Sequence, residues 1–89
     1  MSAAAVSLLE QINAAKDVEL AYRAQAAGIV RRYNAEANRD PYSPLAESLF
    51  KLRKEALSQW KAAREQKAAL LLRWSCLNRS AQAYARAVT

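Results

Sequence analysis

The sequence predicts an all-α protein, an antiparallel hairpin of two long helices that pack like a coiled coil. Among its 89 residues there is a single glycine, and residues that favour helices, above all alanine and leucine, dominate. Both prolines, Pro41 and Pro44, fall in one short stretch, where they interrupt an otherwise helical pattern. On either side of that stretch, apolar residues recur at steps of three and four, which is typical of a helix with one buried face.

The first helix is expected at about residues 3–38. Its apolar stripe has a gap at Val18 and Glu19, and Pro41 ends the helix because the residue before a proline avoids the helical conformation. Gly28 within it indicates close contact with the neighbouring helix, and a functional kink is the alternative. The stripe comprises Ala5, Leu8, Ile12, Ala15, Tyr22, Ala26, Ile29, Tyr33 and Ala37.

The second helix is expected at about residues 45–88, after a loop at 39–44. Ser43 suits the capping position and Pro44 the first helical position. A break of this helix near residues 75–80 is an alternative, because the residues there have weak helix propensity. The stripe comprises Leu45, Leu49, Leu52, Ala56, Trp60, Ala63, Lys67, Leu70, Trp74, Leu77, Ala81, Tyr84 and Val88, and its two successive steps of four predict a stutter. The short loop makes the helices antiparallel within a single domain, 1–89.

Segment 70–77 is apolar nearly all round, although a hairpin covers only one side of each helix. We therefore expect oligomerisation or a partner to complete the fold. Trp60 and Trp74 share one face, where they fill the core, anchor an interface or stack on nucleotide bases. The candidate interface residues are Leu57, Trp60, Leu71, Leu72, Trp74 and Cys76.

The net charge of +6 is unevenly placed. Residues 1–39 carry five basic and four acidic side chains, whereas residues 40–89 carry nine and four. This indicates an acidic partner, either a protein or, as the less favoured alternative, a nucleic acid. The candidate basic stripe comprises Arg53, Lys54, Lys61, Arg64, Arg79 and Arg86.

Lys67 occupies a stripe position where the pattern requires an apolar residue. An unpaired buried ammonium is costly, and in a hairpin hinged near residue 42 this lysine lies opposite Asp17 and Glu19. We therefore predict an ion pair between Lys67 and one of these acids that fixes the register of the helices.

Catalysis and cofactor binding are not expected. The chain has no histidine and no arrangement typical of a nucleophile, a carboxylate pair or a phosphate loop. A single cysteine excludes an internal disulfide. No signal peptide or membrane-spanning run is recognised, which favours the cytoplasm or the interior of a macromolecular assembly.

The order of helix, loop from Pro41 to Pro44 and second long helix is similar in shape to type III secretion needle protomers. Ser58, Trp60 and Arg64 resemble the Ser-x-aromatic…Arg run of that family's second helix. The C-terminal residues lack that family's apolar and aromatic ending. As a likeness of shape, the resemblance implies a subunit of a secretion-type assembly.

The sequence thus predicts a non-enzymatic protein that works through protein–protein contact. It would be a subunit of a homo-oligomer or larger complex, such as a phage or secretion assembly, or a small adaptor or inhibitor. The alternative is a basic accessory protein that binds nucleic acid.

Overall fold

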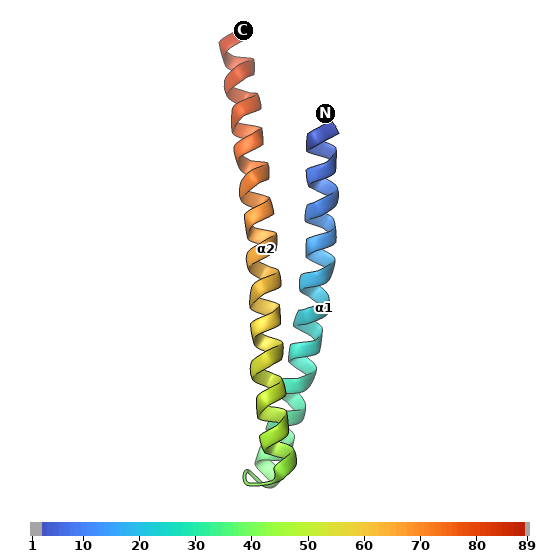
Figure 1. Cartoon of the computed structure of the whole chain (residues 1–89). Helices are drawn as coiled ribbons and strands as arrows, with labels where there is room; N and C mark the ends of the chain where they lie inside the picture. Colours follow the sequence, from blue (N-terminus) through green and yellow to red (C-terminus); the bar gives the residue numbers. More distant parts are fainter. Residues whose placement is uncertain (1–2, 89) are drawn as a thin grey trace.

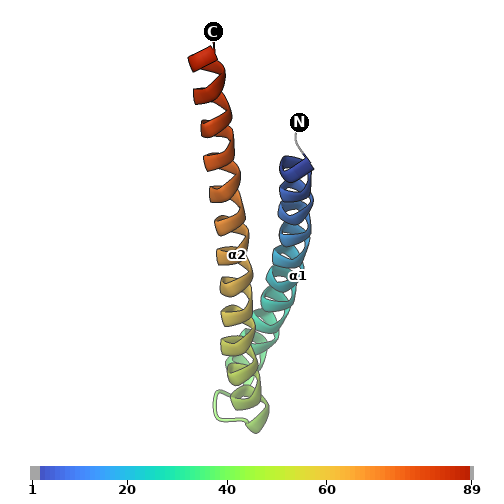
Figure 2. The ribbon, with the colours of Figure 1, turned by 45° about the horizontal axis from the view of Figure 1, so that its top comes forward.

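Two helices and the loop that joins them make up the part of the chain that the structure describes. The computed structural model describes the backbone of residues 3–88 and the side chains of residues 3–79. Helix α1 spans Ala3–Arg39 and helix α2 spans Pro44–Val88. They lie antiparallel (Figure 1), in a rod of 69 × 18 × 14 Å. This confirms the predicted all-α hairpin. The second view shows the helices close together near the loop and further apart toward the termini (Figure 2).

Both helices turn side chains inward in an uninterrupted seven-residue pattern, with steps of three and four in alternation. The inward residues of α1 are Ala5, Leu8, Ile12, Ala15, Glu19, Tyr22, Ala26, Ile29, Tyr33 and Glu36. Those of α2 are Ala46, Leu49, Arg53, Ala56, Trp60, Ala63, Lys67, Leu70 and Trp74. All of them are buried or half-buried, so the seam between the helices is continuous.

The stripe expected for the second helix is wrong at its start. Leu45 and Leu52 are 53% and 48% exposed, and Ala46 and Arg53 are the inward residues instead. An unbroken seven-residue pattern, continued back from Ala56, reaches these two positions without the local unwinding that a stutter requires. Helix α2 also continues through residues 75–80 without a break.

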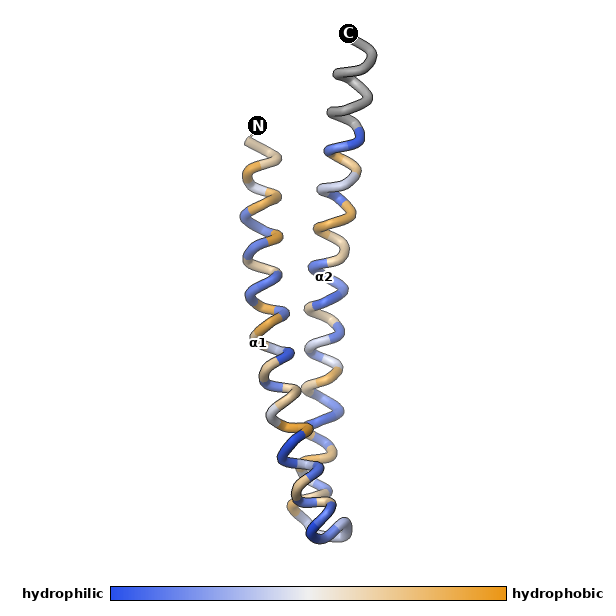
Figure 3. The backbone as a smooth tube through the Cα atoms, turned by 180° about the vertical axis from the view of Figure 1, so that it is seen from behind, coloured by the Kyte–Doolittle hydropathy of each residue, from blue (hydrophilic) through white to orange (hydrophobic). Residues whose placement is uncertain are grey.

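The core between the helices is thin. Its buried apolar residues are Ala5, Leu8, Ala26, Ala46, Leu49, Ala56 and Ala63, and no large side chain among the described residues is completely buried. Alanines allow two helices to approach closely but remove little apolar area from water. Hydrophilic and hydrophobic residues alternate along the coloured parts of both helices (Figure 3), so neither helix has a long stretch of apolar residues alone.

A cluster of polar contacts at the loop joins the end of α1 to the start of α2. The Ser43 hydroxyl accepts a hydrogen bond from the Ala46 backbone N–H at 3.0 Å, which caps α2. The same hydroxyl donates to Glu36 Oε1 at 2.9 Å, and the Arg39 Nε–H donates to Glu36 Oε2 at 3.2 Å. We call Glu36, Arg39 and Ser43 the loop clasp.

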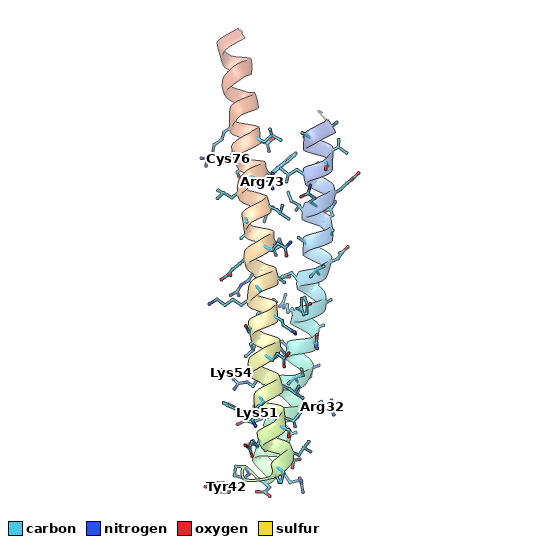
Figure 4. The ribbon with its side chains drawn as sticks, viewed as in Figure 1. Arg32, Tyr42, Lys51, Lys54, Arg73 and Cys76 are labelled. Atoms are coloured by element: carbon cyan, nitrogen blue, oxygen red, sulfur yellow. The ribbon has the colours of Figure 1, made fainter. Side chains whose placement is uncertain are left out.

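The turn itself is held by Asp40. Its carbonyl accepts a hydrogen bond from the Ser43 N–H, and its carboxylate accepts one from the Tyr42 N–H at 3.1 Å. Pro44 then begins α2, where its missing N–H leaves no donor unpaired. Tyr42 is 94% exposed and projects from the tip of the hairpin (Figure 4).

The loop clasp predicts a loss of stability in acid. The hydrogen bonds from Arg39 and then Ser43 lower the pKa of Glu36, because both favour the charged carboxylate. A lowered folded pKa gives stability that is present above the ordinary carboxyl pKa and is lost as the pH falls through the folded value. We expect Glu36→Gln to remove this part of the acid dependence, measured as the urea midpoint by circular dichroism across pH. The matched control, Glu65→Gln on the exposed side of α2, should keep the wild-type dependence; equal profiles for wild type and Glu36→Gln would contradict the prediction.

Candidate interaction surfaces

A charged layer crosses the centre of the seam. Lys67 Nζ lies 3.6 Å from Glu19 Oε1, and the indole N–H of Trp60 donates to the same oxygen at 3.4 Å. The side chains of Glu19 and Lys67 are 9% and 27% exposed, so water reaches the carboxylate little and the ammonium somewhat more. Of the two acids opposite Lys67, Glu19 is the one in contact, whereas Asp17 is exposed on the outer side of α1.

This layer also defines which residues lie level with one another. Glu19 contacts both Trp60 and Lys67, so residues of α1 and α2 whose numbers add up to about 82 lie at the same height. The ring contact of Tyr33 with Phe50, with centroids 5.8 Å apart, agrees with this register.

Two arginines of the expected basic stripe lie against aromatic rings. The Arg53 guanidinium is 5.6 Å from the centroid of Tyr33, and that of Arg64 is 5.1 Å from the centroid of Trp60. Arg53 is half-buried, and its Nε has no hydrogen-bond partner within the described part of the chain. The expectation that Arg53 belongs to an exposed row is therefore wrong, because its seven-residue position points it into the seam.

The other members of the expected basic stripe lie on different sides of the hairpin. Lys54, Lys61 and Arg64 are exposed on one side of the hairpin, while Arg79 is exposed on the outer side of α2. Arg86 lies outside the residues whose side chains the structure describes.

Helix α1 adds two cations to this side that the sequence reasoning missed. Lys16 and Arg23 stand four residues after inward positions of α1, as Arg64 does in α2, and in an antiparallel pair these positions share one side. The place of Lys16 and Arg23 in the seven-residue repeat was the signal in the sequence that could have identified them. We call Lys16, Arg23, Lys54, Lys61 and Arg64 the basic flank.

A groove runs along the opposite side of the hairpin. It consists of four hollows between α1 and α2 that follow one another from the open end toward the loop. The hollow at the open end is the largest, about 640 Å³, and Leu8, Leu72 and Leu77 help to line it. Figure 4 shows Arg32 of the groove and Lys54 of the basic flank projecting to different sides.

Uncharged residues form nearly all of the groove. Of the described side chains that line it, only Arg32 and Arg73 carry charge. The remaining outer lining residues are Ala4, Ser7, Gln11, Ala14, Val18, Ala24, Gln25 and Gly28 of α1 and Leu52, Gln59, Ala62, Gln66 and Cys76 of α2. We call this surface the neutral groove.

Gly28 opens onto the neutral groove and does not touch α2 closely. A Cβ built at this position would meet no atom within 4 Å among its non-local neighbours. The expectation of close contact between the two helices at Gly28 is therefore wrong, since the space beside it is open.

The six candidate interface residues do not form one surface. Leu57 and Leu71 follow inward residues by four and lie on the side of the basic flank, whereas Leu72 and Cys76 line the neutral groove. The two tryptophans are half-buried in the seam. Apolar exposure is thus present on both sides of α2, with Leu72 at 65% exposure.

Comparison with known proteins gives no match to a family model, a curated protein or a solved structure. No helix within residues 3–88 is long and apolar enough to cross a membrane. The described side chains include no group of three or more His, Cys, Asp or Glu placed to hold a metal ion. The exposed cations on one side of the hairpin and the groove on the other make these two sides its candidate functional surfaces.

The charged layer makes a prediction about stability. Lys67→Leu leaves the buried Glu19 carboxylate with only the Trp60 indole, and we expect a loss on the order of 2 kcal/mol in the free energy of unfolding. The double variant Glu19→Leu/Lys67→Leu should recover most of that loss, because no buried charge remains. Urea unfolding followed by circular dichroism measures both, and Lys61→Leu on the exposed surface is the control. If the double variant loses as much free energy of unfolding as Lys67→Leu and Glu19→Leu lose together when each is measured alone, the pair is not coupled.

Proposed function

We propose that this protein is a non-enzymatic subunit that works by packing against other protein chains in a homo-oligomer or larger assembly. The observation that carries the proposal is the number of large apolar side chains left exposed by a helix pair with so thin a core. They are Val6, Val18, Leu20, Tyr42, Leu45, Phe50, Leu52, Leu71, Leu72 and Leu77. Such exposed hydrophobic surface suggests a partner.

Covering these exposed residues would contribute a large free energy compared with the free energy that burial within the seam of a single hairpin contributes. Completing the burial of one half-exposed leucine contributes roughly 1 kcal/mol. Among the described side chains, five of the seven buried apolar ones are alanines, which contribute less each. A chain with this balance gains much of its stability from association.

The polar groups of the hairpin fit a structural role and not a catalytic role. The buried carboxylate of Glu19 is held by Lys67, and Glu36 is held by Arg39 and Ser43. These groups are committed to register and to the loop. A structural component of a phage or secretion-type assembly, or a small adaptor or inhibitor, fits these features.

The proposal predicts a native mass above that of the single chain. We expect the protein to elute above its 9.9 kDa mass, either purified or in an extract of its source, by size exclusion with light scattering. Leu72→Glu should reduce the assembly to free chains that remain helical by circular dichroism. The matched control is Ser58→Glu, at the same outward position of α2, which should leave the assembly unchanged. A single-chain mass for wild type in both samples would overturn the proposal.

The basic flank supports a second candidate function, the binding of a nucleic acid. Lys16 and Arg23 of α1 lie on the same side as Lys61 and Arg64 of α2, near the middle of the hairpin. Cations from two helices on one side could follow a phosphate backbone.

Salt dependence separates this candidate from apolar association. We expect the affinity for a double-stranded oligonucleotide to fall steeply with salt, and Arg23→Gln and Lys61→Gln each to reduce the logarithmic slope by about one. An apolar interface responds little to salt. Fluorescence anisotropy measures the slope, with Arg79→Gln on the outer side of α2 as the control. Absence of binding at 50 mM salt would exclude the candidate.

A further inference from the structure

We infer that a second copy of this chain covers the neutral groove, packed face to face about a two-fold axis at the level of Val18 and Arg64. The inference rests on the proposed interaction function and specifies its partner. The resulting dimer is a four-helix bundle in which every helix is antiparallel to its neighbours, an arrangement that helix dipoles favour.

Charge indicates why identical copies would meet on this side. The chain carries a net charge of +6, so two copies repel wherever their charged surfaces meet. Between the loop clasp and the open end, the charged residues on the groove side are Arg32, Glu55 and Arg73; Glu55 stands one repeat before the groove residue Ala62. Contact through this side leaves both basic flanks in solvent.

The positions of two opposite charges select the orientation. Glu55 and Arg73 of α2 are equally far from Arg64, which lies level with Val18 by the register of the hairpin. Val18 is also midway between Ala4 and Arg32, which line the two ends of the groove. A two-fold axis at this level, perpendicular to the helices, brings each Glu55 level with Arg73 of the second copy.

The same axis brings exposed apolar groups into open space. Leu52, which is 48% exposed, comes level with Cys76 of the second copy, at the hollow of about 640 Å³. This exposed leucine of each copy thus meets a hollow on the other.

The size of the groove side suits a stable dimer. From Ala4 to Arg32 it runs for about 42 Å at 1.5 Å per residue. With a rod width of 18 Å, each copy offers about 750 Å². The total of about 1,500 Å² lies in the range of specific protein–protein interfaces. A single peptide helix lying in the groove would cover a narrower strip and would leave Glu55 and Arg73 without matching charges.

Disulfide trapping tests the orientation. Leu52→Cys places a thiol level with Cys76 of the second copy, so mild oxidation at low protein concentration should give a covalent dimer in non-reducing electrophoresis. Wild type should not cross-link, because its two Cys76 residues would lie about 36 Å apart along the bundle. Lys54→Cys, two residues further along α2 and on the basic flank, is the matched control and should also remain uncross-linked.

Charge exchange tests the pairing independently. Glu55→Arg and Arg73→Glu each place like charges opposite one another twice per dimer, and we expect each to raise the dimer dissociation constant on the order of tenfold. The double variant Glu55→Arg/Arg73→Glu should return to the wild-type value. Sedimentation equilibrium measures the constants, and circular dichroism checks that all three variants remain helical.

Several results would overturn the inference. They are a single-chain mass for purified wild type, cross-linking of wild type through Cys76, equal cross-linking of the Lys54→Cys control, or failure of the double charge variant to recover. If the purified chain is a single copy but forms a larger assembly in an extract, the second-copy inference fails while the proposed function stands. If the mass is that of one chain in both samples, both fail.

Discussion

The uninterrupted seven-residue spacing of inward residues is the constraint on which the rest of the structure depends. It holds in both helices at once, so one seam can run from the loop to the open end. Every other residue then has a fixed side. Lys16 and Lys61 lie on one side, and Gln11 and Gln66 line the other, although nothing in their local sequence distinguishes these sides. The division of the surface into a basic flank and a neutral groove follows from the repeat.

Adherence to this spacing puts polar residues in the seam. The repeat requires Glu19, Arg53 and Lys67 to point inward. Glu19 and Lys67 pair with each other, and Arg53 lies against the ring of Tyr33, although its Nε lacks a hydrogen-bond partner among the described residues. Such contacts contribute little net stability because desolvation offsets attraction. Their effect is on specificity, since a shift of one repeat would leave Glu19 without Lys67. The two helices are therefore held in one register by specific charges, while the thin seam contributes little to the stability of the hairpin.

Much of the fold could be predicted from the sequence because its determinants are local. Pro41 and Pro44 end and begin helices wherever they occur, and Ser43 caps the helix that follows it. The stripe of the second helix near the loop could not be read correctly, because Leu52 is more apolar than Arg53 and only the aromatic ring of Tyr33 makes the arginine acceptable inside. The sides of the hairpin were also beyond the sequence reasoning, which treated each helix alone. Lys16, Arg23 and the neutral groove emerge only when two helices are placed in register.

The loop clasp has a consequence for how the chain finds its fold. Joining Glu36 to Ser43 closes a very short loop, whereas joining Glu19 to Lys67 closes one of nearly fifty residues. The entropy lost in closing a loop grows only with the logarithm of its length, and each layer formed near the clasp shortens the loop that remains for the next. The hairpin can therefore zip from the clasp toward the termini, with every step local to the one before it. In such a zipper the layers furthest from the clasp open first, and these are the layers beside the largest hollow of the groove.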